Sequence, residues 1–379
     1  MRGKKWDIFC TVVDNFGDIG VCWRLARQLA IEHGLLVRLW VDDLHSLRRL
    51  CPEIKAPCEE QTLFGVVVRH WGTPFPHADV ADVVIEAFAC DVPESYLAAM
   101  AARPGKPAWI NLEYLSAQDW VSTCHRLASP HPRLPLTKYF FFPGFVAASG
   151  GLLREAHLMR QRDAIQVGPA AGWHGLGLPF PMPGEASVSM FCYENPALPE
   201  LLHTWANGKA RMRCLIPEGR PLTQVAAALG DPPLQAGDQV RQGNLMLYAL
   251  PFLSQENYDH LLWLCDLNFV RGEDSFVRAQ WAAQPLVWHI YPQEDAAHLA
   301  KLEAFLALYC QDLTPTALRA CSELWLSWNR GNGAEVAAAW PDFWQVQPEL
   351  KAHAANWSKH LCEQADLARQ LVLFSENLL

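Results

Sequence analysis

The sequence predicts an α/β protein made of two Rossmann-like domains that face each other across a ligand-binding cleft. Short apolar runs alternate with helical patterns in both halves of the chain, and this alternation is typical of parallel sheets. A segment rich in Gly and Pro, residues 167–184, separates the two halves. The length of 379 residues exceeds what one ordinary core supports, so two domains are expected.

The first half opens with a strand, a turn, a helix and a second strand. Residues 6–13 are a short apolar run, 14–20 contain glycines, and the apolar residues of 21–33 recur at helical spacing up to Gly34. Residues 35–41 form the next apolar run, so a βαβ unit with a right-handed crossover is expected. The same reasoning predicts strands at 66–69, 80–86, 108–112 and 140–142, and a helix at 93–102.

The second half repeats this organisation as another parallel α/β unit. Its predicted strands are 186–191, 212–217, 245–250, 267–270 and 285–291, and its predicted helices are 199–207, 222–229 and 258–265. The remaining chain has helical spacing at 296–309, 314–327 and 352–374. We therefore expect a first domain over 1–170 and a second over 185–356, with a last helix, about 357–379, able to pack back on the first.

The composition narrows the class of partner. A formal net charge of −9 disfavours general nucleic-acid binding, which requires a basic surface. No apolar run approaches the roughly 20 residues needed to span a bilayer, and Asp7 and Asp14 interrupt the amino-terminal run too early for a signal peptide. Twelve cysteines without a CxxC pair indicate reduced thiols in a cytoplasmic protein, and not disulfides or a zinc site.

The first turn, DNFGDIG, carries two carboxylates, Asp14 and Asp18, on either side of Gly17. It lacks the GxGxxG pattern and the Lys of a phosphate-binding loop, which disfavours a nicotinamide or P-loop site. A carboxylate at the end of a strand can act as a general base or hold a cation. Asp18 could equally be the cap of the following helix, a role that suits aspartate, and the turn alone leaves both readings open.

The second turn, RGEDS at 271–275, follows a predicted strand and precedes a predicted helix. Ser275 is expected at the helix N-cap, where free backbone amides and Arg271 would together bind a diphosphate. Glu273 and Asp274 would repel phosphate if both pointed inward, so one carboxylate is expected on a sugar hydroxyl or a base. The alternative is a capped connection whose charges face water.

Aromatic residues end three strands of the second half. Phe191 and Tyr193 follow one, Phe252 follows another, and Tyr291 follows a third. Each alone is more common in a core, but at one end of one sheet they favour a pocket for a flat base. The amide of Gln255 could read the edge of that base.

Several long strings carry a family resemblance that covers essentially the whole chain. They are DIFCTVVDNFGDIGVCWRLARQLA, INLEYLSA, FFFPGF, GGLLRE, MFCYEN and CDLNFVRGEDSFVRAQWAAQPLVWHIYPQ. In these strings the chain resembles the bacterial protein-arginine rhamnosyltransferases of translation elongation factor P, the EarP family. Strings of this length are far more specific than any short motif.

The resemblance implies a fold, a reaction and a set of site residues. The fold is that of GT-B glycosyltransferases, and the reaction moves L-rhamnose from dTDP-β-L-rhamnose, with inversion, to one arginine of elongation factor P. Asp14 and Asp18 fall in the catalytic turn, with Asp18 favoured as the base, and Glu273 is also implicated in catalysis. The residues implied to bind the donor are Asn15, Phe16, Gly17, Phe191, Tyr193, Phe252, Gln255, Arg271, Gly272, Asp274, Ser275 and Tyr291.

The resemblance also shapes the expected partners. The expected partners are the donor dTDP-β-L-rhamnose and the protein acceptor elongation factor P, with the acceptor on the first domain. No cofactor is expected. No metal is expected either, because neither turn contains an Asp-x-Asp motif. One departure is Ser254, where Pro would be expected before Gln255, and it bears only on the placement of that side chain.

Two other functions remain compatible with the residues. A nucleotide-sugar epimerase of the same architecture would share the donor pocket and need no protein acceptor. A non-catalytic protein that binds a nucleotide or a translation factor would share the pocket without the chemistry.

Overall fold

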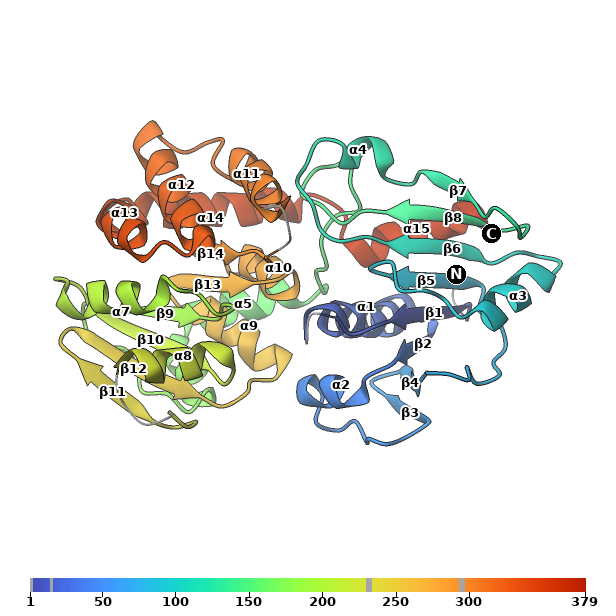
Figure 1. The fold of residues 1–379 in the computed structure, drawn as a ribbon, viewed down its shortest axis with the longest axis horizontal. Helices are drawn as coiled ribbons and strands as arrows, with labels where there is room; N and C mark the ends of the chain where they lie inside the picture. The colour runs from blue at the N-terminus through green and yellow to red at the C-terminus, as the bar shows by residue number, and fades with distance from the viewer. Residues whose placement is uncertain (1–2, 14–15, 230–233, 293–296) are drawn as a thin grey trace. The chain divides into compact units, whose positions relative to one another are not determined.

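The computed structural model describes residues 3–13, 16–229, 234–292 and 297–379. The chain divides into two compact units, each with its own sheet (Figure 1). Unit 1 contains residues 1–156 and 363–379, and unit 2 contains residues 157–362. In the described part of the chain, no helix is both long and apolar enough to cross a membrane.

Unit 1 is built on an eight-stranded sheet in the order β3-β4-β2-β1-β5-β6-β8-β7. The six inner strands are parallel, and β3 and β7 pair antiparallel at the two edges. The inner strands follow the doubly wound order 3-2-1-4-5-6 of Rossmann folds. The strands are β1 Lys5–Cys10, β2 Leu36–Val41, β3 Glu60–Leu63, β4 Val66–His70, β5 Val83–Ala87, β6 Ala108–Leu112, β7 Ala128–Pro130 and β8 Thr137–Phe141.

The two faces of this sheet are covered by different helices. Along β1, Ile8 lies in the core beneath α1 and α15, whereas Phe9 points to the opposite face and packs on Tyr96 of α3, as the two-residue period of a strand requires. Gly34 ends α1 in the left-handed conformation at φ 64°, as the sequence predicts. The helices are α1 Gly17–His33, α2 Leu44–Leu50, α3 Glu94–Ala102, α4 Val121–Cys124 and α15 Leu367–Leu378.

Unit 2 contains a six-stranded sheet in the order β11-β12-β10-β9-β13-β14. Five strands are parallel, and β11 pairs antiparallel with β12, so the sheet is mixed and not purely parallel as predicted. The strands are β9 Glu185–Met190, β10 Arg211–Pro217, β11 Gln239–Gln242, β12 Leu245–Leu250, β13 Leu267–Arg271 and β14 Leu286–His289. The helices are α5 Leu158–Val167, α6 Pro169–Gly175, α7 Leu198–Asn207, α8 Arg220–Leu229, α9 Gln255–Leu264, α10 Asp274–Ala282, α11 Ala297–Tyr309, α12 Pro315–Arg330, α13 Gly333–Gln345 and α14 Gln347–Cys362.

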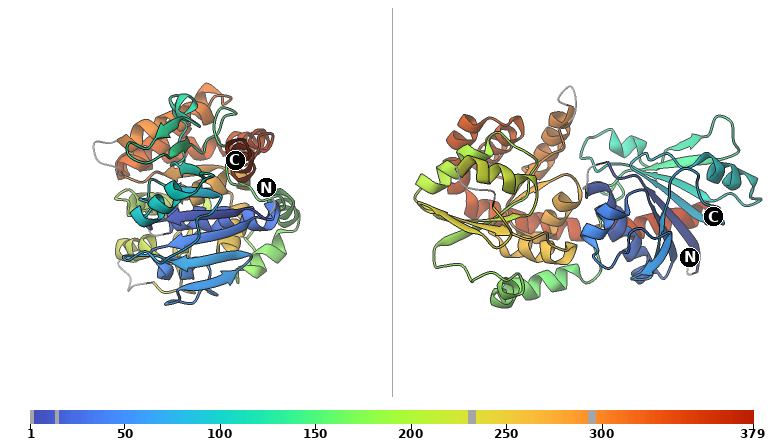
Figure 2. Two further views of the ribbon diagram at one scale, coloured as in Figure 1. Left: turned by 90° about the vertical axis from the view of Figure 1, so that its right-hand side faces the viewer. Right: turned by 60° about the horizontal axis from the view of Figure 1, so that its bottom comes forward.

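The division between the units differs from the Gly- and Pro-rich segment at 167–184. Helices α5 and α6 belong to unit 2, and the green α5 and α6 lie along the yellow elements of that unit in the right-hand view of Figure 2. The side-chain amide of Gln166 donates to the carbonyls of Trp263, at 3.1 Å, and Ala282, at 3.0 Å. Trp173 is buried in the core of unit 2. Buried aromatic and amide contacts therefore override the loop-like composition.

The predicted helix at 352–374 is two helices, and the prediction is wrong on this point. Helix α14 ends at Cys362 in unit 2, and α15 begins at Leu367 in unit 1. Asp366 caps α15 by accepting a hydrogen bond from the Arg369 amide at 3.0 Å, and the side-chain amide of Gln28 from α1 donates to the same carboxylate at 3.1 Å. The cap and its contact with α1 place the last helix on unit 1.

Candidate functional site

Each sheet has one point where the parallel strand order reverses direction. In unit 1 this topological switch point lies between β1 and β5, and in unit 2 it lies between β9 and β13. Ligands of open α/β sheets bind beyond the carboxyl ends of the strands at such points. The two turns that the sequence singles out follow β1 and β13, so each lies at the switch point of its own unit.

At the switch point of unit 2, the guanidinium of Arg271 lies over two aromatic rings. Its guanidinium carbon lies 4.5 Å from the ring centre of Phe191 and 4.8 Å from that of Tyr193. Both distances are within the range of cation–π contacts. Tyr193 also packs edge-on against Tyr291, with ring centres 5.4 Å apart, and Phe191 packs edge-on against Tyr258 at 5.4 Å. The aromatics predicted after β9 and β14 therefore meet around the predicted phosphate-binding arginine.

The turn after β13 differs from its prediction in one respect. Helix α10 starts at Asp274 and its N-cap position is Glu273, so the expectation that Ser275 is the N-cap is wrong. Gly272 adopts the left-handed conformation at φ 57°. The chain therefore enters the helix with Glu273 at the N-cap, two residues before the predicted Ser275. The Ser275 hydroxyl instead accepts the Arg271 amide at 3.0 Å and donates to the Arg271 carbonyl. It therefore holds the backbone of Arg271 directly.

The two acidic residues of this turn have partners from other helices. The Glu273 carboxylate pairs with the ammonium group of Lys301 from α11, 3.1 Å away, and both side chains are mostly buried. The Asp274 carboxylate accepts from the side-chain amide of Gln255, at 3.5 Å. Lys301 thus offsets one of the negative charges that would repel a diphosphate. Sequence analysis missed Lys301, because it lies 28 residues beyond its partner and no local pattern marks it.

Gln255 and Phe252 lie at the start of α9. Ser254 is the N-cap of this helix and accepts the Asn257 amide at 3.2 Å. The serine noted as a departure in the sequence thus supplies a helix cap, and Gln255 becomes the first, buried residue of α9. Phe252 is half-buried in the connection between β12 and α9.

His289 is a buried residue beside this cluster that sequence analysis did not single out. It is the last residue of β14, pairs in register with Arg271 and is 4% exposed. Its ring packs edge-on against Tyr193, with ring centres 5.3 Å apart, and against Trp328 at 5.8 Å. Burial, and then the positive charges of Arg271 and His298, lower the pKa of His289 to about 3, so the ring is neutral at pH 7.

In unit 1, Asp18 lies at the start of α1 and is 4% exposed. The N-cap position belongs to Phe16, whose side chain makes no capping hydrogen bond to the described residues, and Gly17 is the first helical residue. The Asp18 carboxylate reaches back and accepts the amide of Val13 at 3.0 Å. Asp18 is therefore not the N-cap residue of α1, which was the alternative to a catalytic role. Asp14 and Asn15, also predicted in this turn, lie outside the described residues.

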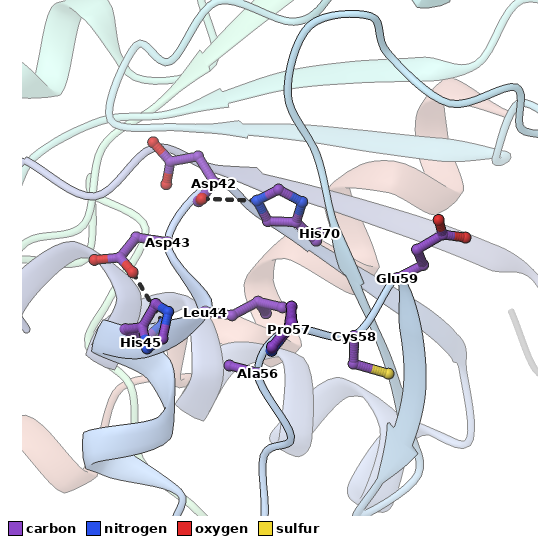
Figure 3. A pocket seen from close by; sticks show the side chains of 9 residues that line it. All are labelled: Asp42, Asp43, Leu44, His45, Ala56, Pro57, Cys58, Glu59 and His70. Carbon is purple, nitrogen blue, oxygen red and sulfur yellow. Dashed lines mark hydrogen bonds between the residues drawn. The ribbon is translucent and has the colours of Figure 1, made fainter.

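A second carboxylate holds the same loop from the neighbouring strand. Asp42 follows β2 and accepts the amide of Val12 at 3.0 Å, next to the amide bound by Asp18. Asp42 also lines a surface pocket of about 320 Å³, in which a ring nitrogen of His70 lies 3.1 Å from the Asp42 carbonyl (Figure 3). The other lining residues are Asp43, Leu44, His45, Ala56, Pro57, Cys58 and Glu59. Sequence analysis did not find this pocket.

The strand on the other side of the unit 1 switch point ends in an unusual backbone conformation. Phe88 and Ala89, directly after β5, adopt φ 57° and φ 55°, although neither is glycine. Such left-handed residues cost about 1–3 kcal/mol each and are found where surrounding contacts impose them, often at functional sites. Here the Phe88 ring stacks on Tyr114 at 4.9 Å, and the Asn111 side chain accepts the Ala89 amide at 3.3 Å.

No group of three His, Cys, Asp or Glu side chains suited to a metal ion is present in the described parts of either unit. The site residues of unit 2 are instead a cation, aromatic rings, an amide, a hydroxyl and carboxylates. This set matches the chemistry of a nucleoside diphosphate: positive charge and backbone amides for phosphate, and rings and an amide for a base.

Comparisons with known proteins identify the family of the chain. The chain matches the family model of the elongation factor P (EF-P) rhamnosyltransferase EarP over residues 6–376. It is 50% identical over 377 residues to a protein-arginine rhamnosyltransferase of Pseudomonas putida KT2440, a match that covers 99% of each chain. It is also 50% identical over 373 residues to that of Pseudomonas aeruginosa PAO1, covering 98% of each chain.

Solved structures extend the comparison to the fold. A structure concerning EarP-mediated arginine glycosylation of translation elongation factor EF-P is 38% identical, with a TM-score of 0.71, and covers 99% of this chain and 100% of that one. MurG from Acinetobacter baumannii is 12% identical, with a TM-score of 0.53 and 99% of each chain covered, which indicates the fold alone. The fold is thus that of the GT-B glycosyltransferases, as predicted, and the chain belongs to the family of elongation factor P rhamnosyltransferases, EarP.

Proposed function

We propose that this chain transfers L-rhamnose from dTDP-β-L-rhamnose to the side chain of one arginine of elongation factor P, with inversion at the anomeric carbon. The observation that carries the donor half of this proposal is the position of Arg271. A fixed guanidinium, flanked by Phe191 and Tyr193, lies at the switch point of unit 2. That is where open α/β sheets bind nucleotides.

The diphosphate is bound by the turn at the start of α10. Arg271 supplies a permanent positive charge, and the positive end of the α10 helix dipole lies at the same turn. Ser275 holds the backbone of Arg271, and Lys301 offsets the charge of Glu273. Tyr291, Phe252 and Gln255 are assigned to the thymine base and its sugar.

The acceptor arginine requires activation by a base. A guanidinium is a weak nucleophile because its lone pairs are delocalised and it is protonated at pH 7. We assign the base to Asp18, whose buried carboxylate follows the first strand of unit 1. As the bond between the guanidinium nitrogen and the anomeric carbon forms, the nitrogen loses a proton to the carboxylate. The bond from that carbon to the dTDP oxygen breaks at the same time.

As the glycosidic bond breaks, negative charge develops on the diphosphate of dTDP, next to the turn that contains Arg271. Arg271 and the N-terminal amides of α10 can stabilise that charge as it develops, which is the role a metal ion has in other transferases. The proposed reaction therefore needs no metal and no other cofactor. Asp14 and Glu273 are assigned to orienting the remaining N–H groups of the guanidinium or the sugar.

We assign the protein acceptor to unit 1, because the switch point of unit 2 is occupied by the donor in this proposal. The acceptor works in translation, so the reaction is placed in the cytoplasm. All twelve cysteines of the chain lie among the described residues and are free thiols, which fits a reducing compartment.

Intact-mass spectrometry tests the proposal. The chain is incubated with dTDP-β-L-rhamnose and folded elongation factor P, and the expected result is the addition of one deoxyhexosyl residue to one arginine of the acceptor. An acceptor with that arginine replaced by Lys should remain unmodified. NMR of the product should show the α-anomer, which is the sign of inversion.

The same reaction mixtures separate the alternatives. An epimerase would change the donor sugar without any acceptor, and a non-catalytic binding protein would leave both the donor and the acceptor unchanged. Either result would contradict the proposed transfer.

A further inference from the structure

The side chain of His289 packs against Tyr193, one of the two aromatic residues whose rings lie next to Arg271. It is 4% exposed, and its Nδ1 atom is buried and makes no hydrogen bond to the described part of the chain. Its contacts are instead with rings: Tyr193 at 5.3 Å and an interplanar angle of 76°, and Trp328 at 5.8 Å and 69°. Packing, and not hydrogen bonding by Nδ1, therefore holds this ring.

The contacts of Tyr193 connect His289 to Arg271. One edge-on contact of Tyr193 is to His289, another is to Tyr291, and the guanidinium of Arg271 lies 4.8 Å from the centre of the Tyr193 ring. The backbones of the two outer residues are also linked, since Arg271 and His289 are register partners and the Gly272 amide donates to the His289 carbonyl at 3.3 Å. A change in the volume of residue 289 therefore reaches Arg271 through Tyr193.

We propose that His289 is a positioning residue of the donor site, whose ring holds Tyr193 against Arg271 and so aims the guanidinium at the diphosphate. It does not touch the donor in this proposal. The inference rests on the donor half of the proposed function, the binding of dTDP at the Arg271 turn.

The ring can fill this position because it carries no charge. Burial and the charges of Arg271 and His298 keep the pKa of His289 far below neutrality. A protonated His289 would place a second positive charge near the guanidinium of Arg271, and the two charges would repel each other. An aromatic ring that is neutral by nature, such as phenylalanine, should therefore replace His289 in its supporting role.

The first test compares His289→Ala and His289→Phe by titration calorimetry with dTDP and with thymidine. Arg271 contacts the diphosphate, which thymidine lacks. The affinity for dTDP divided by the affinity for thymidine therefore reports how well the guanidinium is oriented toward the diphosphate. We expect His289→Ala to lower this ratio by about tenfold, a loss in line with a weakened charge-assisted contact. His289→Phe should restore the ratio to within about threefold of the unaltered chain.

These variants separate positioning from a loss of folding. A purely structural role would weaken dTDP and thymidine equally and leave the ratio unchanged, which would overturn the proposal. So would a His289→Phe variant with as low a ratio as His289→Ala. The matched control is His353→Ala, which removes a histidine that packs edge-on against Tyr309 in the same unit at 4.7 Å. It should leave the ratio unchanged.

A double-mutant cycle then tests whether His289 acts through Arg271. In an Arg271→Ala background, His289→Ala should have no further effect on dTDP affinity, because the group that it positions is already missing. Additive losses would contradict the proposal.

The cycle requires no acceptor, so its result is independent of the transfer reaction. A chain that binds dTDP but leaves elongation factor P unmodified would overturn the proposed function and not this inference. A chain that does not bind dTDP would overturn both.

Discussion

The carboxylate of Asp18 accepts a hydrogen bond from the amide of Val13 at 3.0 Å. This bond ties α1, the helix of the first βαβ unit, to the loop that follows β1. Asp42, directly after the adjacent strand β2, accepts the neighbouring amide of that loop, at Val12, in the same way. The two aspartates have the same local contact, but only Asp18 lies in the turn assigned to catalysis. This pair therefore provides an informative variant and its matched control.

We expect Asp18→Asn to abolish transfer while dTDP binding is preserved. The amide oxygen of asparagine can still accept the Val13 amide, so the loop should keep its shape, but the amide cannot take a proton. A loss of well over tenfold in kcat, or more than about 1.4 kcal/mol in the barrier, is expected. Initial rates and dTDP calorimetry measure the two effects separately.

Asp42→Asn is the control for that experiment, because it makes the same chemical change at the neighbouring amide. It should keep most of the activity. If Asp18→Asn stays within about tenfold of the unaltered chain, Asp18 is not the base, and Asp14 becomes the next residue to replace.

Arg271→Ala should weaken dTDP binding by roughly ten- to a hundredfold, because a charge-assisted contact with phosphate contributes about 1.5–3 kcal/mol. The control is Arg319→Ala, which removes an arginine from the same unit whose side chain is 63% exposed. Calorimetry with dTDP gives both values. Unchanged affinity for dTDP in Arg271→Ala would contradict the assignment of Arg271 to the diphosphate.

Activity should survive an excess of EDTA. In the proposed reaction Arg271 and the amides at the start of α10 stabilise the leaving diphosphate, so chelation removes nothing that the transfer needs. Rates measured before and after chelation should agree within error. A rate that falls with EDTA and returns with Mg²⁺ would show that a metal takes part.

Folded elongation factor P should be a far better acceptor than a short peptide around its target arginine. The chain is acidic overall, with a net charge of −9, so long-range attraction is not expected to bring in an acidic partner. Contacts with the folded acceptor can align the guanidinium for attack, which a flexible peptide does poorly. The measurement is kcat/KM for both acceptors at saturating donor, and equal values would indicate recognition of a linear motif.

His125 should make unit 1 less stable as the pH falls below neutrality. Its Nδ1 accepts the Phe142 amide at 3.1 Å, and burial, with a smaller contribution from Arg126, lowers its pKa to about 4. Since the unfolded chain, with a pKa near 6.5, binds the proton more readily, the contribution to stability is complete above about pH 6.5. It is then lost as the pH falls toward 4.

The variant His125→Asn tests this dependence, because it keeps an acceptor for the Phe142 amide and removes the titrating ring. Thermal unfolding midpoints at pH 7.5 and 5.0 should differ less in the variant than in the unaltered chain. The group is partly exposed, so the effect should be smaller than the full 1.4 kcal/mol per pH unit. Parallel pH profiles of the two proteins would contradict the prediction.

The sequence by itself determined the inner strands and the residues that follow them. Strands buried on both faces appear as continuous apolar runs, and so 108–112 and 245–250 were predicted with the bounds of β6 and β12. The edge strands β3 and β11 were missed because their sequences, EQTL and QVRQ, are polar and partly exposed. Since parallel strands bring their carboxyl ends to one edge, the sequence also predicted one pocket lined by Phe191, Tyr193, Phe252 and Tyr291. In the structure Phe191 and Tyr193 lie against Arg271, and Tyr291 packs on Tyr193.

Only the tertiary structure decided which partner each of these groups has. The pairing of Lys301 with Glu273 and the packing of His289 against Tyr193 both join residues that are distant in the chain. Ser275 fits the N-cap rule in sequence, yet Gly272 turns the chain earlier and the hydroxyl closes on Arg271 instead. Local patterns report the periodicity of burial. They carry no information about which distant side chain fills the space beside a given group, and packing in three dimensions decides that.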